Sequence, residues 1–259
     1  MSTPRNFSFA RSVARAFVMI GLTILLSSQA GADPAADKAL EAQILKVIRD
    51  HPKEIMEAVV GYQRAQAEQR MKSAETRLKE QVGQLKVGEL LADSPRRGNA
   101  SSALVLVEFS DFECPYCAKA HTIVQQFMAA HGREVALVYK HLPLADMHPQ
   151  ATPAALAAWA AQQQGKFWEF HDVMFDTQDK LGEVFYTDTA RRLGLDLARF
   201  NADRNGAAAQ AVIQRDTELA KKLGIVATPQ FLMNGVPITG AAPLEEFERV
   251  LAQARAAIK

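Results

Sequence analysis

The chain has 259 residues, 48% of them hydrophobic and 23% charged, which is the composition of a folded globular protein and not of a disordered chain. The first 32 residues contain three arginines and no acid, so the remainder holds 27 of the 30 basic groups against all 29 acidic ones. A slightly acidic remainder gives no reason to expect nucleic acid as a partner.

Residues 1–32 have the pattern of an export signal. The three arginines precede an apolar segment at residues 16–26, and Ala30-Gly31-Ala32 has the small residues of a cleavage site. The apolar segment is far shorter than the ~20 residues that span a bilayer, so we favour a cleaved signal over a retained anchor. We predict cleavage after Ala32 and a soluble mature protein in the periplasm.

The next segment, residues 33–92, is predicted to form a helical arm. Apolar residues from Leu40 to Ile48 recur at the spacing of one helix face, and His51-Pro52 ends this helix, because the residue before a proline is disfavoured in a helix. A second helix begins at Pro52 and becomes markedly polar, with only a weak heptad pattern. Such a helix needs a partner. The partner is either the catalytic domain of the same chain or the arm of another copy, and we favour homo-oligomerisation through residues 33–91.

The main domain is predicted to begin after a turn-rich linker at residues 92–102. A strand, a helix and a strand follow at residues 103–109, 115–130 and 134–140, an order that predicts a βαβ unit with parallel strands. Helical patterns then fill residues 149–223. The chain is predicted to close with a hairpin that turns at Asn234-Gly235 and with an amphipathic helix, at residues 230–239 and 244–258.

The only two cysteines are Cys114 and Cys117, in the run Cys-Pro-Tyr-Cys. Cys114 follows a predicted strand and precedes Pro115, which suits the first position of a helix. Unpaired backbone N–H groups at a helix N-terminus stabilise a thiolate, so we expect the pKa of Cys114 to be lowered. We predict that Cys114 is the exposed attacking thiol and that Cys117, one turn along, resolves the mixed disulfide, with Pro115 and Tyr116 tuning the thiolate.

Two other uses of a cysteine pair fit less well. A structural disulfide that closes so short a loop would restrict the unfolded chain very little. A zinc site needs four ligands, and the sequence has neither a second Cys-x-x-Cys nor paired histidines at ligand spacing. We take His121, His131 and His141 to be surface or packing residues, and we predict a redox-active disulfide with no metal and no organic cofactor.

Glu108 interrupts an otherwise apolar strand. Burial disfavours the charged form of a carboxyl group, so a buried Glu108 would have a raised pKa and could exchange a proton with Cys117. The alternative is a solvated Glu108 at the strand end. Lys140, at the end of the neighbouring strand, is a candidate charge partner for it. Glu113 adjoins Cys114, but the sequence does not fix the direction of its side chain.

As a set, these motifs resemble the DsbA-like branch of the thioredoxin superfamily. The resemblance covers about residues 98–259 and rests on residues 108–117, Lys140, residues 165–172, and residues 227–235 with Ala227-Thr228-Pro229-Gln230-Phe231 at their start. It implies an α/β thioredoxin fold with an inserted helical domain, and it places Glu108 where the family has its buried acid. It also implies a cis bond at Thr228-Pro229 that faces the cysteines, with the Thr228 backbone pairing with an extended substrate peptide.

The arm departs from the pattern of a monomeric oxidase. It resembles exported DsbA-like proteins of the suppressor-of-copper-sensitivity and Com-type groups, some of which oligomerise through such an arm and act as isomerases. The predicted organisation is therefore a signal peptide at residues 1–32, a helical arm at residues 33–92 and a DsbA-like domain at residues 93–259, with the insertion at residues 149–223.

We therefore expect a thiol-disulfide oxidoreductase that isomerises or oxidises protein substrates, together with a membrane redox partner protein. Two alternatives stay open at this point. One is a copper-stress protein that binds the metal through its thiols or acts as a chaperone. The other is a glutaredoxin-like reductase, because Cys-Pro-Tyr-Cys occurs in that class too, although the export signal and the helical insertion argue against it.

Overall fold

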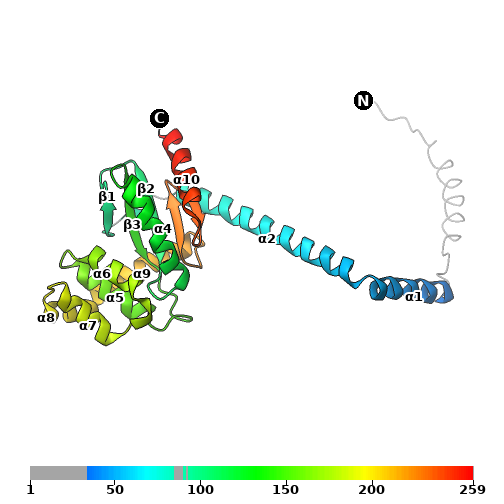
Figure 1. The fold of residues 1–259 in the computed structure, drawn as a ribbon, viewed down its shortest axis with the longest axis horizontal. Helices are drawn as coiled ribbons and strands as arrows, with labels where there is room; N and C mark the ends of the chain where they lie inside the picture. Colours follow the sequence, from blue (N-terminus) through cyan, green and yellow to red (C-terminus); the bar gives the residue numbers. More distant parts are fainter. Residues whose placement is uncertain (1–33, 85–89, 92, 259) are drawn as a thin grey trace, which may run out of the picture. The chain divides into compact units, whose positions relative to one another are not determined.

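The computed structural model describes residues 34–84, 90–91 and 93–258, and Figure 1 shows their helices and strands. The predicted signal peptide at residues 1–32 lies outside the described residues. The chain divides into two compact units, Met1–Ala67 and Glu68–Lys259. Within the described part of the chain, no helix has the length and apolar character needed to cross a membrane.

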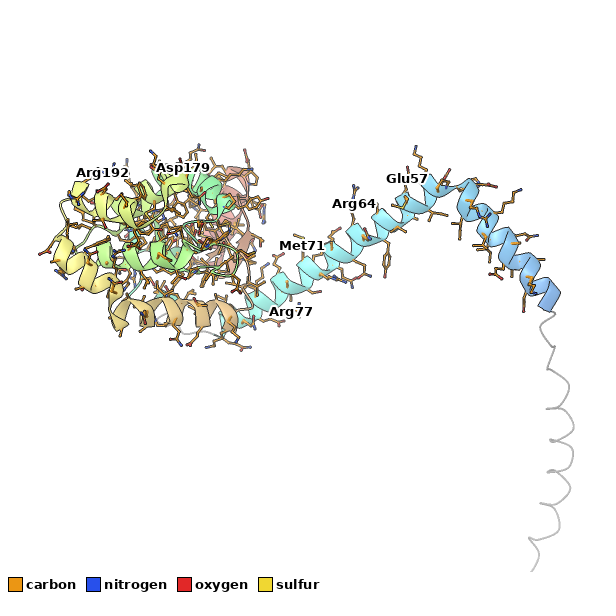
Figure 2. All side chains as sticks on the ribbon, turned by 90° about the horizontal axis from the view of Figure 1, so that it is seen from below. Glu57, Arg64, Met71, Arg77, Asp179 and Arg192 are labelled. Atoms are coloured by element: carbon orange, nitrogen blue, oxygen red, sulfur yellow. The ribbon has the colours of Figure 1, made fainter. Side chains whose placement is uncertain are left out.

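Two helices begin the described chain, α1 (Pro34–Asp50) and α2 (Pro52–Gly83), with the break at His51 where the sequence predicts it. Pro52 is the first residue of α2, a position where its missing N–H costs no hydrogen bond. The apolar stripe of α1 is between 46% and 58% exposed at Leu40, Ile44, Val47 and Ile48. In Figure 2, where Arg64 and Met71 are labelled, side chains project from α2 on several sides.

A five-stranded sheet in the order β1-β3-β2-β4-β5 forms the centre of the second unit. The parallel pair at its centre confirms the predicted βαβ unit, and the other neighbouring strands are antiparallel. The strands are β1 (Arg96–Gly98), β2 (Leu104–Ser110), β3 (Val135–His141), β4 (Gln230–Met233) and β5 (Val236–Thr239).

The presence of β1 corrects the prediction that residues 92–102 form only a linker. Long-range contacts hold this short polar strand: the Arg97 guanidinium binds the Asp172 carboxylate with N···O distances of 3.2 and 2.7 Å and lies over the Trp168 ring. Gly98 ends the strand at φ +84°, and a Cβ there would lie 2.4 Å from the carbonyl oxygen of Val135. The local sequence shows neither the contact of Arg97 with Asp172 nor the close approach of Gly98 to Val135.

Alternate residues of the strands face two different helical layers. On one face Leu104, Leu106 and Leu137 pack against α4 (Pro115–His131) and α10 (Leu244–Ala257). On the other face Val107 and Phe109 pack with residues at and after the end of α9 (Ala207–Lys222). Every residue of β3 is therefore buried, whichever way its side chain points.

The helical insertion lies between β3 and β4, in agreement with the prediction for residues 149–223. In Figure 1 its helices α5, α6, α7 and α8 gather beyond one end of the strands. Their bounds are α5 (Ala151–Gln162), α6 (Phe167–Asp176), α7 (Glu183–Arg192) and α8 (Leu197–Asn205), with a 3-10 turn, η1, at Gln178–Lys180. Their core joins Phe112 and both cysteines in one apolar cluster, so the insertion adjoins the cysteine pair.

The second half of α2 belongs to the unit that contains the sheet, so the two units do not meet at the predicted domain boundary near residue 92. Leu78 is only 8% exposed and packs with Val107 and Phe109, and Val82 packs beside the same cluster. For this part of the arm, the partner is the chain's own domain. The expected pairing with the arm of another copy does not apply to these residues.

Candidate active site

Cys114 lies at the junction of the loop after β2 and the start of α4. It is the N-cap residue of α4, with φ −70° and ψ 121°, and Pro115 follows at the first helical position, as predicted. Cys117 is on the first turn of the same helix, and both thiols are free. Cys114 is 4% exposed and Cys117 is fully buried, so the expectation of an exposed Cys114 is wrong. The segment before β4 lies against it: the Cys114 sulfur is 3.6 Å from the carbonyl oxygen of Thr228.

The two thiols have opposite acidities. The pKa of Cys114 is lowered to about 5. The largest cause is a hydrogen bond from the Cys117 thiol, and backbone N–H groups of the first turn lower the pKa further, whereas burial acts in the opposite direction. Burial, followed by this same hydrogen bond to Cys114, raises the pKa of Cys117 far above that of an ordinary thiol. At neutral pH, Cys114 is therefore a thiolate and Cys117 is a thiol. These are the acidities that the predicted roles of attacking and resolving cysteine require.

The Asp111 carboxylate fixes the turn that presents Cys114. One of its oxygens accepts the backbone N–H of Glu113 at 2.8 Å. The other accepts the backbone N–H of Leu144 at 2.9 Å and pairs with Nδ1 of His148 at 2.8 Å. Against the opposing effect of burial, the hydrogen bond and charge of Asp111 raise the pKa of His148. Asp111 thus ties the cysteine turn to the segment that leads into α5.

Two further bonds join this turn to the helical insertion. The Glu113 carboxylate, whose direction the sequence left open, accepts the backbone N–H of Gln150. The Gln178 side-chain amide donates to the carbonyl oxygens of Phe112 at 2.7 Å and Cys114 at 2.9 Å. The sequence analysis missed Asp111, His148 and Gln178 because their contacts join segments up to 66 positions apart.

Glu108 is 2% exposed, so its predicted burial in β2 is confirmed. Burial raises the pKa of Glu108 to about 7, although Ser110 and Arg97 act in the opposite direction. Its direct neighbour on β3 is Tyr139, whose ring also packs in the cluster that contains the cysteines. A carboxyl group with this pKa can take up and release a proton at neutral pH.

Lys140 does not pair with Glu108 as the sequence suggested. Its ammonium group lies 3.0 Å from the carboxylate of Asp216 on α9, with the two side chains 0% and 2% exposed. The physical reason is the alternation of the strand: Glu108 is opposite Tyr139, and the next residue, Lys140, points to the other face of the sheet. Lys140 therefore belongs to the packing of α9 and not to the proton chemistry of the cysteines.

The Thr228-Pro229 peptide bond is cis, which confirms the expectation drawn from the family resemblance. Tyr116, inside the motif, is 64% exposed, and Val226, two residues before Thr228, is 81% exposed. The cysteine motif and the segment before β4 thus each carry an apolar side chain that is open to solvent.

Metal-ligating groups come together at one other place among the described residues. His121, His171 and Asp172 offer donor atoms within 4.8 Å of one another. Both oxygens of Asp172 bind Arg97, and one also bonds Nδ1 of His171 at 2.9 Å. Nε2 of His121 bonds the side chain of Gln125 at 2.9 Å. A guanidinium group already neutralises the carboxylate, so we assign no metal to this cluster.

Comparison with solved structures places this site in a known fold. A thioredoxin-like oxidoreductase from Silicibacter pomeroyi is 32% identical, with a TM-score of 0.62 over 66% of this chain and 99% of that one. A linker-deletion mutant of Proteus mirabilis ScsC is 21% identical, with a TM-score of 0.62 over 89% of this chain and all of that one. The thiol-disulfide exchange protein α-DsbA2 of Wolbachia pipientis is 19% identical, with a TM-score of 0.63 over 70% and 97% of the two chains. The predicted resemblance to DsbA-like and ScsC-like proteins is confirmed at the level of the fold.

Curated relatives match over part of the chain. The Na(+)/H(+) antiporter NhaA 3 of Salinispora tropica is 42% identical over 142 residues, which are 54% of this chain and 21% of the antiporter. The NhaA antiporter of Herminiimonas arsenicoxydans is 36% identical over 159 residues, 61% of this chain and 25% of that protein. The chain thus spans about a fifth to a quarter of the length of the curated relatives it matches. Residues 91–253 match the family model described as thioredoxin, and the chain belongs to that family.

Proposed function

We propose that the protein is a periplasmic thiol-disulfide oxidoreductase that exchanges disulfides with protein substrates through Cys114 and Cys117. The observation that carries this proposal is the opposite acidity of two neighbouring thiols. The pKa of Cys114 is about 5, whereas that of Cys117 is strongly raised. One thiol is ready to attack at neutral pH and the other is held in reserve.

The reaction follows from this arrangement. The Cys114 thiolate attacks a substrate disulfide, forms a mixed disulfide and releases the other substrate sulfur as a thiolate. Cys117 then loses its proton, and its thiolate attacks the Cys114 sulfur, which forms the Cys114–Cys117 disulfide and releases the substrate thiolate. In the opposite direction, a substrate thiolate attacks the Cys114 sulfur of the oxidised protein. No organic cofactor is needed, because the cysteine pair itself carries the two electrons.

Glu108 is the group we assign to the proton of Cys117. It is buried on the face of the sheet that α4 covers, and its pKa of about 7 lets it accept a proton and return it at neutral pH. Lys140 takes no part in this step, because it pairs with Asp216 on the other face.

Protein substrates dock around the segment that covers Cys114. Tyr116, two residues after Cys114, and Val226, two residues before Thr228, offer exposed apolar surface. The backbone of Thr228 lies against the Cys114 thiol, where an extended peptide can pair with it. This surface favours unfolded or partly folded chains, and a membrane redox protein restores the oxidation state of the cysteines after turnover.

The exposed apolar stripe of α1 supports homo-oligomerisation through the arm. Ile44 and its neighbours on that stripe are about half exposed, and a helix this apolar on one side is stable when it packs against a partner. Oligomers hold several cysteine pairs together, which favours isomerisation over net oxidation. We expect Ile44→Asp to lower the mass measured by light scattering, whereas Ala42→Asp, which adds the same charge to the opposite face of α1, leaves it unchanged.

Activity assays test the whole proposal. The protein should reactivate a substrate with scrambled disulfides, and Cys114→Ser should abolish this activity. A parent protein that neither reshuffles nor oxidises a cysteine-containing substrate would refute the proposed function. The same assays on the Ile44→Asp variant separate the directions, because a dissociated protein should oxidise reduced substrate but reshuffle scrambled substrate poorly.

A further inference from the structure

Two polar side chains stand on the face of β2 that α4 covers. Residues of a strand alternate between faces, so Glu108 and Ser110 continue the row that begins with Leu104 and Leu106. The first two members of this row pack with α4 and α10. Because α4 connects two parallel strands, it runs back along β2, and its first turn, with Cys117, lies over the end of the strand where Ser110 stands.

The hydroxyl of Ser110 stands on the same face of β2 as Glu108, the face that the first turn of α4 covers with Cys117. Ser110 is 1% exposed, and its hydroxyl has no hydrogen-bond partner among the described residues. It nevertheless lies close enough to lower the pKa of Glu108, of Cys117 and of Tyr139. A buried hydroxyl without a fixed partner is costly and is free to rotate, so it can donate to one neighbour and accept from another.

Other titratable groups stand on the elements around this hydroxyl. On β3, Tyr139 and His141 face it, and His141 is a neutral ring because burial lowers its pKa to about 4. The neighbouring elements contribute Arg97 of β1, Asp111 of the loop, Cys117 of α4 and His171 of α6. On β4, the residue opposite Glu108 is Phe231, which does not titrate. Asp111 is already engaged with Glu113, Leu144 and His148.

We propose that Ser110 is a positioning residue that relays the proton between the Cys117 thiol and the Glu108 carboxylate. This inference rests on the proposed function. Glu108 stands two residues before Ser110 on β2, about 7 Å farther from the start of α4, so the Ser110 hydroxyl between Glu108 and Cys117 shortens the path of the proton. During resolution, Ser110 accepts the proton of Cys117 and passes its own hydroxyl proton to Glu108. The Cys117 thiolate then attacks Cys114, and Ser110 ends with the same number of protons as before.

The test follows the decay of the mixed disulfide between Cys114 and a substrate peptide as a function of pH. Ser110→Ala should slow this decay about a hundredfold near neutral pH, the lower end of what a positioned proton-transfer group contributes. Ser110→Thr keeps the hydroxyl and should restore most of the rate. Ser94→Ala removes another buried hydroxyl, before β1, that has no hydrogen-bond partner in the described part of the chain, and it should leave the rate unchanged.

A double-mutant cycle separates a relay from a general loss of packing. In a Glu108→Gln background the proton acceptor is absent, so Ser110→Ala should slow resolution by less than twofold more. The rate at which Cys114 forms the mixed disulfide should stay at the parental value in every Ser110 variant. A parent protein that forms no mixed disulfide would refute the proposed function itself. Two results would overturn the relay alone, provided that the mixed disulfide forms normally. One is that Ser110→Ala resolves it at the parental rate, and the other is that Ser110→Ala and Ser110→Thr resolve it equally slowly.

Discussion

The Lys140 ammonium group donates to the Asp216 carboxylate at 3.0 Å in a part of the interior where neither side chain reaches solvent. The same carboxylate accepts the backbone N–H of His141 at 3.2 Å, so Asp216 attaches α9 to the end of β3. This ion pair fixes one layer of the domain, and it leaves Glu108, on the opposite face of the sheet, without a cationic neighbour on β3.

Loss of one partner of this ion pair should destabilise the fold strongly. Asp216→Ala leaves the Lys140 charge buried and unpaired, so we expect the free energy of unfolding to fall by about 3–5 kcal/mol. Urea denaturation measures the change. Replacement of both partners, Lys140→Met with Asp216→Leu, should recover most of the loss.

Glu246→Ala is the matched control, because it removes one partner of the ion pair between Glu246 and Arg249, which is more exposed than the pair of Lys140 and Asp216. It should lower the free energy of unfolding by about 1 kcal/mol or less. An Asp216→Ala variant as stable as this control would contradict the structural role given to the buried pair.

The error about Lys140 shows where sequence reasoning stops. The alternation of the strand was visible, but Asp216 lies 76 positions away on a helix whose place in the fold the sequence does not state. The same limit hid β1, which depends on Arg97 reaching Asp172, and it hid the contact of Leu78 with the sheet. Short-range patterns predicted what depends on neighbours in the chain: the break at His51, the helix start at Cys114 and the Asn234-Gly235 turn.

The acidity of Cys114 should depend on the residue at position 117. The hydrogen bond from the Cys117 thiol is the largest cause of the lowered pKa of Cys114. Cys117→Ser keeps a donor, so its Cys114 should stay acidic, with a pKa near 5, whereas Cys117→Ala should raise the pKa of Cys114 toward that of a free thiol. The ultraviolet absorbance of the thiolate, followed against pH, measures both variants. Equal pKa values in the two variants would show that the helix N-terminus alone sets the acidity.

The burial of Glu108 should make the fold less stable as pH rises. The pKa of Glu108 is about 7 in the folded protein, above its unfolded value. Its ionisation therefore does not change the stability at acid pH, where the group is protonated in both states, and destabilises the fold once pH passes the unfolded pKa. Glu108→Gln removes this titration, so its unfolding free energy relative to the parent should rise by about 3 kcal/mol between about pH 4 and pH 8. Urea denaturation at a series of pH values measures it, and a difference independent of pH would contradict the raised pKa.

His148 should stabilise the fold most at low pH, because its pKa, that of a base, is raised in the folded protein. Its pKa is raised in the folded protein by Asp111, so its contribution is complete below the unfolded pKa of about 6.5 and fades as pH rises through the folded value. His148→Gln keeps a donor for Asp111 but cannot titrate. The parent should therefore be more stable than this variant at about pH 5, and the gap should narrow by about pH 9. A gap that widens with pH would contradict a protonated His148 bound to Asp111.

Trapping of a substrate protein on the Cys117→Ser variant tests the central claim most directly. The variant can attack a disulfide but cannot resolve the product, so a cysteine-containing substrate should accumulate on it as a mixed disulfide. Mass spectrometry of the digested complex should find the substrate cysteine joined to Cys114, and Cys114→Ser should trap nothing. A Cys117→Ser protein that captures no substrate while its Cys114 is free and acidic would contradict disulfide exchange as the function of this chain.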